Sequence, residues 1–160
     1  LRTLDSVKSL DLGIDGADEI DPRLDVVKGR GGALLFEKLV ALTCRRYLII
    51  AASEKRVNQL GTRMPLPVEI VPLGWQQTAA RLERVGCRPT LRQVADGAPF
   101  ITDGGHYVLD CTTGPIASAR DMASSIKAIT GVVDHGLFVG LADRAMVVES
   151  DGAVRTLIRR

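Results

Sequence analysis

The chain has 160 residues, 46% of them hydrophobic and 25% charged, a balance that excludes a disordered or fibrous protein. A formal net charge of +2 from scattered basic residues, with 4% aromatic residues, argues against nucleic-acid binding. No apolar run approaches the roughly 20 residues of a membrane span, and the opening LRTLDSVKSL lacks a signal peptide's apolar core. Three cysteines without CxxC spacing favour a reduced, cytoplasmic protein.

The first 61 residues alternate between predicted strands and helices. SLDLGID (9–15) and LDVVKG (24–29) predict short strands, and leucines at helical spacing predict an amphipathic helix from Gly32 to about Arg46. YLIIAA (47–52) is typical of a parallel strand buried on both faces. SEKRVNQLG (53–61) predicts a short helix with Ser53 as its N-cap. This alternation indicates an α/β fold.

Three prolines in TRMPLPVEIVP (62–72) mark a change of pattern. The segments that follow predict strand, helix, strand, strand, helix and strand, an order typical of a small split βαβ lobe: VEIV (68–71), WQQTAARLERVG (75–86), RPTLRQ (88–93), PFITDGGHYVLDC (99–111, a hairpin), IASARDMASSIKAITG (116–131) and VVDHGLFVG (132–140). RAMVVESDGAVRTLIRR (144–160) predicts a final hairpin that turns at Asp151-Gly152. We therefore expect a Rossmann-like α/β core of residues 1–62 and 136–160, with an α+β (ferredoxin-like) lobe of residues 63–135 inserted.

Most chemistry-bearing residues gather in DGADEIDPRLDVVKGRGGALLFEK (15–38). Its glycines match neither a dinucleotide fingerprint, since Leu34 occupies the third glycine position, nor a P-loop, which needs Gly-Lys-Ser/Thr. Acids spaced by three residues also do not form a calcium loop. The segment has no histidine, so no zinc or iron site is expected, and a loose Mg²⁺ site stays as an alternative.

The remaining interpretation of this segment is an acid–base site for an anionic substrate. Asp15 and Asp18 lie at the carboxyl end of one predicted strand, where open α/β sheets bind ligands, and Lys28 ends the next strand. The turn from Gly29 to Gly32 offers backbone N–H groups to an anion. Glu37 follows one turn into the helix, and nearby charges can tune a carboxyl group there for proton abstraction. Solvated surface acids and ordinary turns are the alternative.

Several segments together resemble ribose-5-phosphate isomerase type A. The strongest are IDGADEID and VKGRGGALLFEKLVA, and the likeness continues in the family's order through YLIIAASEKRVNQLG, PLPVEIVP, GCRPTLRQ, PFITDGGHYVLD and GVVDHGLFVGLAD. The resemblance implies interconversion of ribose 5-phosphate and ribulose 5-phosphate through an enediolate, in the pentose phosphate pathway, without metal or cofactor. It implies Glu37 as the general base, with Asp15, Asp18 and Lys28 acting on the sugar hydroxyls and the oxyanion. It also implies a substrate-binding loop and a substrate-binding lysine: Gly29, Arg30, Gly31, Gly32 and Lys55.

The chain departs from the family pattern at Arg30, where many members have glycine, and at Ala52 and Glu54. It contains no Gly-x-Gly-Ser-Thr phosphate loop, so we expect the N-terminal part of the core to be missing. Either the chain is a fragment or truncated product, or its activity is impaired. The family tendency suggests a homo-oligomer, most simply a dimer, with residues 63–135 as a lid or oligomerisation lobe. A non-catalytic phosphosugar-sensing domain and a metal-dependent phosphohydrolase are the alternatives, because fold alone does not imply catalysis.

Overall fold

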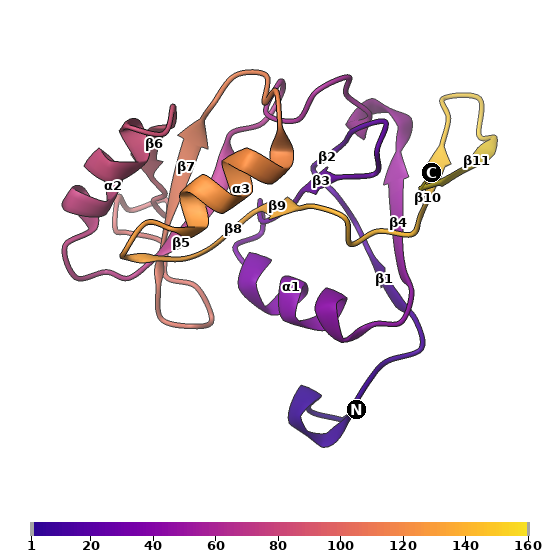
Figure 1. Cartoon of the computed structure of the whole chain (residues 1–160), viewed down its shortest axis with the longest axis horizontal. Coiled ribbons are helices and arrows are strands. Elements are labelled where there is room, and N and C mark those ends of the chain that lie inside the picture. Colours follow the sequence, from indigo (N-terminus) through magenta and orange to yellow (C-terminus); the bar gives the residue numbers. More distant parts are fainter. Residues whose placement is uncertain (1, 160) are drawn as a thin grey trace.

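The structure, a computed structural model, describes residues 2–159. Three sheets and three α-helices make a mixed α/β fold in this part of the chain. In Figure 1, α2 and α3 lie beside one sheet, while α1 lies beside β1 and β4 of another.

The first sheet has the order β1-β4-β10-β11. Its strands are β1 (Gly13–Asp15), β4 (Tyr47–Ala52), β10 (Arg144–Val148) and β11 (Val154–Ile158). The first three run parallel, and β10 and β11 form the predicted C-terminal hairpin, which is confirmed. One face is buried through Tyr47, Ile49, Ala145 and Val147. On the other face Ile50 is 45% exposed, so the prediction that β4 is buried on both faces is wrong for the described residues.

Helix α1 (Leu34–Thr43) connects β3 (Val26–Val27) to β4. Its Ala41 packs with Tyr47 and Ile49 in the core of the first sheet. The helix ends before Arg46 because Cys44 adopts an extended conformation and bridges to Leu10. The predicted helix is therefore confirmed, but its end lies a few residues earlier than expected.

A second, small sheet carries the segment rich in acids. It has the order β2-β3-β9, in which β2 (Glu19–Ile20) and β9 (Leu137–Phe138) both run antiparallel to β3. The predicted strand 132–140 is thus divided, since β8 (Val132–His135) belongs to a different sheet.

The third sheet is antiparallel and has the order β6-β7-β5-β8. Its other strands are β5 (Leu66–Ile70), β6 (Arg88–Leu91) and β7 (Tyr107–Thr112), and α2 (Trp75–Glu83) and α3 (Ala119–Lys127) complete the strand–helix order expected from the sequence. Leu82 of α2 and Ile126 of α3 are fully buried in the same core as this sheet. The predicted domain limits stay a prediction.

The predicted helix over residues 53–61 is wrong. Only a 3₁₀ turn, Ser53–Lys55, forms, and Ser53 does not cap it. Arg56 is extended and bridges to Ile20, and Val57 donates its N–H to the Ile20 carbonyl at 2.9 Å. Pairing with β2 has therefore overridden a weak local helix preference.

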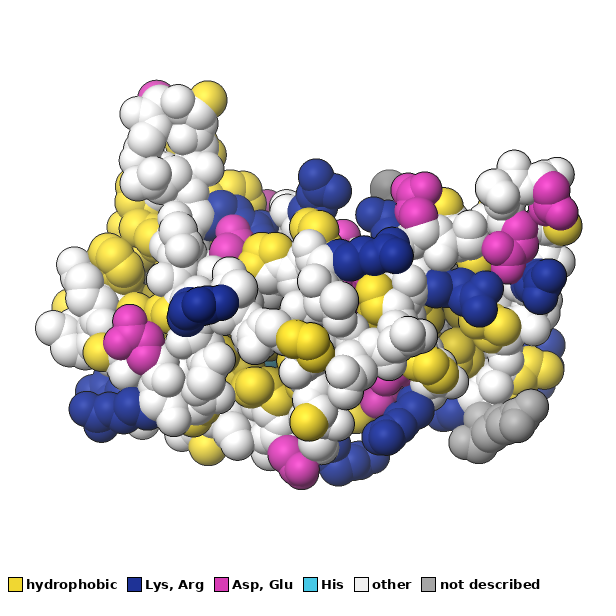
Figure 2. All heavy atoms as spheres, turned by 90° about the horizontal axis from the view of Figure 1, so that it is seen from above, with side chains coloured by type: hydrophobic (Ala, Val, Ile, Leu, Met, Phe, Trp, Pro, Cys, Tyr) yellow, Lys and Arg dark blue, Asp and Glu magenta, His cyan; other side chains and the backbone are white. Residues whose placement is uncertain are grey.

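Two surface properties bear on function. Within residues 2–159, no helix has the length and hydropathy needed to cross a membrane. On the face drawn in Figure 2, lysine and arginine side chains are interspersed with aspartate and glutamate side chains. That face therefore offers no single-sign track for a nucleic-acid backbone.

Candidate active site

Lys28 is at the centre of the charged cluster. It directly follows β3, is buried, and donates its backbone N–H to the Gly136 carbonyl at 2.9 Å. Its Nζ donates to the Gly16 carbonyl at 2.7 Å and lies 2.9 Å from Asp15 Oδ1 and 3.4 Å from Glu37 Oε2. The ammonium group is therefore fixed between two carboxylates.

Asp15 ends β1 and is held by three partners. Besides Lys28, its Oδ1 accepts the Gly16 N–H at 2.7 Å and its Oδ2 accepts the Tyr47 hydroxyl at 2.8 Å. Burial, and then Asp15 itself, raise the pKa of Tyr47, so the phenol stays a proton donor to Asp15. Tyr47 is a site residue that the sequence analysis missed. Its only signal was its position at the start of a strand, where it pairs with Gly13 of β1.

Glu37 is in the first turn of α1. Burial raises the pKa of its carboxyl group, and the charges of Asp15 and Asp18 act in the same direction, while Lys28 opposes them. Oε2 is buried and makes no hydrogen bond within the described chain, although Lys28 Nζ is at ion-pair distance. The group thus combines a raised proton affinity with an oxygen that is free to accept a proton.

The loop from Gly29 to Gly32 adopts a conformation that requires glycine at both ends. Gly29 and Gly32 have φ values of 106° and 88°, which disfavour L residues. The Arg30 N–H donates to Asp18 Oδ2 at 3.0 Å, which brings Asp18 to the loop. The Arg30 side chain is exposed and forms no hydrogen bond or ion pair among residues 2–159.

The α1 N-terminus follows this loop without a side-chain cap, because Ala33 occupies the capping position. Its first N–H groups therefore point toward the loop without a capping partner.

The remaining acids of the segment are structural. Glu19 is fully buried and accepts the N–H groups of Gly61, Arg63 and Met64 at 2.6, 2.6 and 2.9 Å, so it holds the turn before β5. Asp21 accepts the N–H groups of Arg23 and Asp25 at 2.8 and 2.9 Å. Strand and helix periodicity does not separate these acids from Asp15 and Asp18, whereas the resemblance to the family does.

Lys55 is in the 3₁₀ turn after β4 and forms no hydrogen bond or ion pair with the charged cluster among the described residues. The structure therefore brings Lys28 into direct contact with Asp15 and Glu37 and places Asp18 at the glycine loop. The role of Lys55 stays a prediction.

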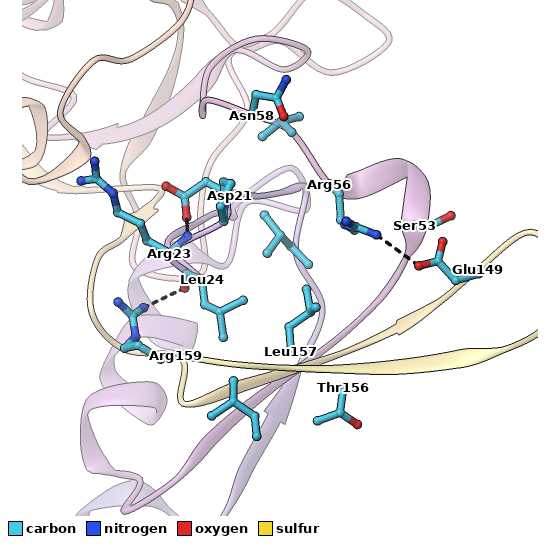
Figure 3. A pocket seen from close by; sticks show the side chains of 14 residues that line it. Asp21, Arg23, Leu24, Ser53, Arg56, Asn58, Glu149, Thr156, Leu157 and Arg159 are labelled. Carbon is cyan, nitrogen blue, oxygen red and sulfur yellow. Dashed lines mark hydrogen bonds and ion pairs between the residues drawn. The ribbon is translucent and has the colours of Figure 1, made fainter.

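An open pocket of about 1160 Å³ lies elsewhere, between the β2–β3 turn, the 3₁₀ turn and the β10–β11 hairpin (Figure 3). Two of its arginine side chains are engaged by neighbouring lining residues. Arg56 contacts Glu149 at 3.1 Å, and Arg159 donates to the Leu24 carbonyl at 2.8 Å. None of the candidate acid–base residues lines it. The candidate site is therefore identified by the chemistry of its side chains and not by the size of this pocket.

The donor set does not resemble a metal centre. Across residues 2–159, no group of three or more histidine, cysteine, aspartate or glutamate side chains is placed to hold a metal ion. Two of the carboxylates at the site already face the Lys28 ammonium group.

Comparisons with known proteins identify the family. Residues 1–152 match the family described as ribose 5-phosphate isomerase A (phosphoriboisomerase A). The chain is 50% identical over 153 residues to ribose-5-phosphate isomerase A of Synechococcus sp. (strain JA-3-3Ab), covering 95% of this chain and 66% of that protein. It is 51% identical over 154 residues to the Roseiflexus sp. (strain RS-1) enzyme, covering 96% and 66%.

Solved structures agree with these relatives. A D-ribose-5-phosphate isomerase in complex with phospho-erythronic acid superposes with a TM-score of 0.94 at 34% identity, covering 99% of this chain and 69% of that one. The ribose 5-phosphate isomerase of Plasmodium falciparum gives a TM-score of 0.90 at 39% identity, covering 95% and 67%. The chain thus spans about two thirds of the length of these relatives. On sequence and fold together, the chain belongs to the ribose 5-phosphate isomerase A family.

Proposed function

We propose that the chain carries the proton-transfer site of an aldose–ketose isomerase that interconverts ribose 5-phosphate and ribulose 5-phosphate. The observation that carries the proposal is the arrangement of Glu37 and Lys28, in which a carboxylate oxygen without a hydrogen bond lies 3.4 Å from a fixed ammonium group. Family membership supports the substrate class. Because the chain spans 66% of the Synechococcus relative, the activity of the whole protein is part of the proposal.

In the proposed reaction Glu37 removes the proton from C2 of the open-chain aldose. The electron pair of that bond forms the C1–C2 double bond, and the carbonyl oxygen O1 takes up the negative charge. Lys28 stabilises this charge, an effect worth several kcal/mol when the donor is preorganised. Glu37 then returns the proton to C1, while the O2 hydroxyl proton passes to O1 and C2 becomes the carbonyl carbon. Asp15 and Asp18 orient the hydroxyl groups that exchange this proton.

The raised pKa of Glu37 supports its role as a base. A base is most effective when its pKa approaches the working pH, since it must both accept and release the proton. The Tyr47 hydroxyl and Lys28 hold Asp15 in place. This carboxylate therefore needs no reorganisation during the reaction.

The glycine loop is the proposed wall of the substrate cleft. Uncapped N–H groups at Gly31 and the start of α1 suit an anionic substrate. Gly29, Arg30, Gly31 and Gly32 would contact the sugar phosphate, and Lys55 would approach it from the 3₁₀ turn. The complex of a relative with phospho-erythronic acid supports a phosphorylated sugar as ligand.

The finer architecture is also proposed. The parallel sheet with α1 is the described part of a Rossmann-like core, and residues 63–135 form a ferredoxin-like lobe, in which the order β6-β7-β5-β8 supports the assignment. The lobe would act as a lid or in formation of a homodimer. We place the protein in the cytoplasm, since its three cysteines are free thiols.

The test is isomerisation of ribose 5-phosphate by the purified chain, followed as formation of ribulose 5-phosphate. We expect Glu37→Gln to lower kcat by roughly 10²- to 10⁴-fold, the usual contribution of a positioned acid–base group. Binding of phospho-erythronic acid, measured by calorimetry, should survive the substitution. Glu83→Gln at the exposed end of α2 is the matched control and should keep full activity.

Other outcomes distinguish the alternatives. Binding without turnover by the unsubstituted chain would favour a phosphosugar-sensing domain. Activity that is lost with a chelator would favour metal-assisted chemistry. Normal turnover by Glu37→Gln would exclude Glu37 as the base.

A further inference from the structure

Arg92 joins the third sheet to the glycine loop. The residue follows β6, and its Nη1 donates to the carbonyls of both Gly29 and Arg30 at 3.0 Å. Among residues 2–159, no other side chain donates to these two carbonyls. One guanidinium nitrogen therefore bridges two successive peptide units of the loop.

Asp110 of β7 fixes the direction of this guanidinium group. Arg92 Nε lies 2.9 Å from Asp110 Oδ2, and Nη2 lies 2.5 Å from Oδ1. This bidentate geometry uses the Nε–Nη2 edge of the planar guanidinium group and leaves Nη1 to donate to the loop. Both side chains are partly buried, so bulk water does not fully screen the pair.

The loop is held from other sides as well. The Arg30 N–H donates to Asp18 Oδ2 at 3.0 Å, and the Gly32 N–H donates to the Gly29 carbonyl at 3.0 Å. The Phe100 ring packs so closely against Gly32 that a Cβ atom on residue 32 would clash with it. The Arg92 guanidinium group lies 5.7 Å from the centre of the same ring. The backbone is thus set between Asp18 on one side and Arg92 with Phe100 on the other.

We propose that Arg92, oriented by Asp110, is a positioning residue that fixes the glycine loop for substrate binding. Drawing the carbonyls of Gly29 and Arg30 toward the third sheet turns the N–H groups of the loop toward Asp18 and the candidate cleft. Arg92 contacts neither Glu37 nor Lys28, so it acts through the loop and not on the proton-transferring groups. This inference rests on the proposed function for its effect on turnover, but its effect on the loop is independent of activity.

The first experiment measures backbone amide hydrogen exchange in Arg92→Gln without ligand. The probes are the N–H groups of Arg30 and Gly32. The Arg30 N–H donates to Asp18, away from Arg92, whereas the Gly32 N–H shares the Gly29 carbonyl with Arg92 as acceptor. We expect their exchange to accelerate at least about tenfold, while amides between β4 and β10 keep their rates. Unchanged exchange at both loop amides would overturn the proposal, whether or not the chain is an isomerase.

The second experiment measures steady-state kinetics and affinity for phospho-erythronic acid. Because the loop binds substrate in the ground state and the transition state, Arg92→Gln should raise KM and the dissociation constant at least about tenfold, with a smaller change in kcat. The pH at which kcat/KM rises should not change, since the charged groups around Glu37 are the same in this variant. A loss confined to kcat would contradict a positioning role through the loop.

Two further variants separate positioning from folding. Arg88→Gln, at the start of β6, replaces an exposed side chain that makes no hydrogen bond among the described residues and should change neither exchange nor KM. Arg92→Gln leaves Asp110 without its partner, so the double variant Arg92→Gln/Asp110→Asn removes both charges together. The double variant should restore thermal stability, but it should not restore the protection of the loop amides from hydrogen exchange. Recovery of loop protection along with stability would show that the pair is only structural.

Discussion

At the scale of single residues, the candidate site depends on opposing charges around Glu37. Lys28 lowers the pKa of this carboxyl group, whereas burial, Asp15 and Asp18 raise it. Since the base works in its ionised form, kcat/KM should rise with pH through this pKa. Because the pKa of Glu37 is raised overall, its carboxylate can hold the proton that it has removed.

Neutralising the two neighbours should move this pH dependence in opposite directions. Asp15→Asn removes a negative charge, so the pKa of Glu37 falls and the rise of kcat/KM shifts to lower pH. Lys28→Met removes the positive charge, so the rise shifts to higher pH. Both variants lose activity, but pH profiles of the remaining activity separate them. Exposed Asp103→Asn should leave the profile in place; shifts of the same sign in both site variants would contradict the assignment.

Strand patterns could predict which strand ends carry these residues, but the choice of Asp15 and Asp18 among the acids also needed the resemblance to the family. Asp15 ends β1, Asp18 follows it, and Lys28 follows β3, so alternation of strands and loops was enough to place them at strand ends. Glu19 differs because its side chain turns toward the N–H groups of residues 61–64, which approach it only through tertiary packing. Tyr47 was missed for the same reason, since its contact with Asp15 also forms only in the folded chain.

At the scale of elements, the position of Glu37 depends on how α1 is anchored. Lys38, the next residue of the helix, is buried, and its Nζ lies 2.6 Å from Asp134 Oδ1 of β8 and 4.9 Å from the centre of the Phe138 ring. The helix with the candidate base is therefore tied to the third sheet by an ion pair that is largely buried.

Breaking this pair should destabilise the fold. Among the described residues, Lys38→Met leaves the Asp134 carboxylate with Lys127 at 3.5 Å as its cationic partner. We expect a loss of about 3 kcal/mol in the free energy of unfolding, measured by urea denaturation. Arg45→Met removes one partner of the exposed pair with Asp11 and should change stability by less than about 0.5 kcal/mol. Equal effects of the two substitutions would show that the Lys38 pair does not anchor the helix.

The elements differ in how well local sequence determined them. YLIIAA forms β4 over the predicted residues because its β-branched and apolar side chains suit a strand. Residues 53–61 carry helix-compatible side chains, yet Arg56 and Val57 extend to pair with Ile20. A hydrogen-bonding partner from another part of the chain decided that segment, and local patterns do not contain this information.

At the scale of the whole molecule, the first sheet has one buried and one open face. Ile14, Ile50 and Val148 are exposed on strands whose opposite-facing residues, such as Ile49 and Val147, are fully buried. Strand β11 carries Val154 and Ile158 on the same side, so exposed apolar side chains recur on all four strands of this face. Apolar surfaces of this kind favour association.

Self-association of the chain should therefore depend on this surface. Ile50→Thr combined with Val148→Thr keeps β-branched side chains, so the strands should persist. The substitutions replace apolar groups by hydroxyls, so the surface should have a lower tendency to associate. We expect the concentration-dependent increase in scattering, measured by light scattering at matched protein concentrations, to decrease clearly. Leu73→Thr is the control, because Leu73 is 90% exposed but lies on the loop before α2, outside the surface. If this control lowered association as much as the double variant, general surface hydrophobicity and not the open sheet face would drive the contact between chains.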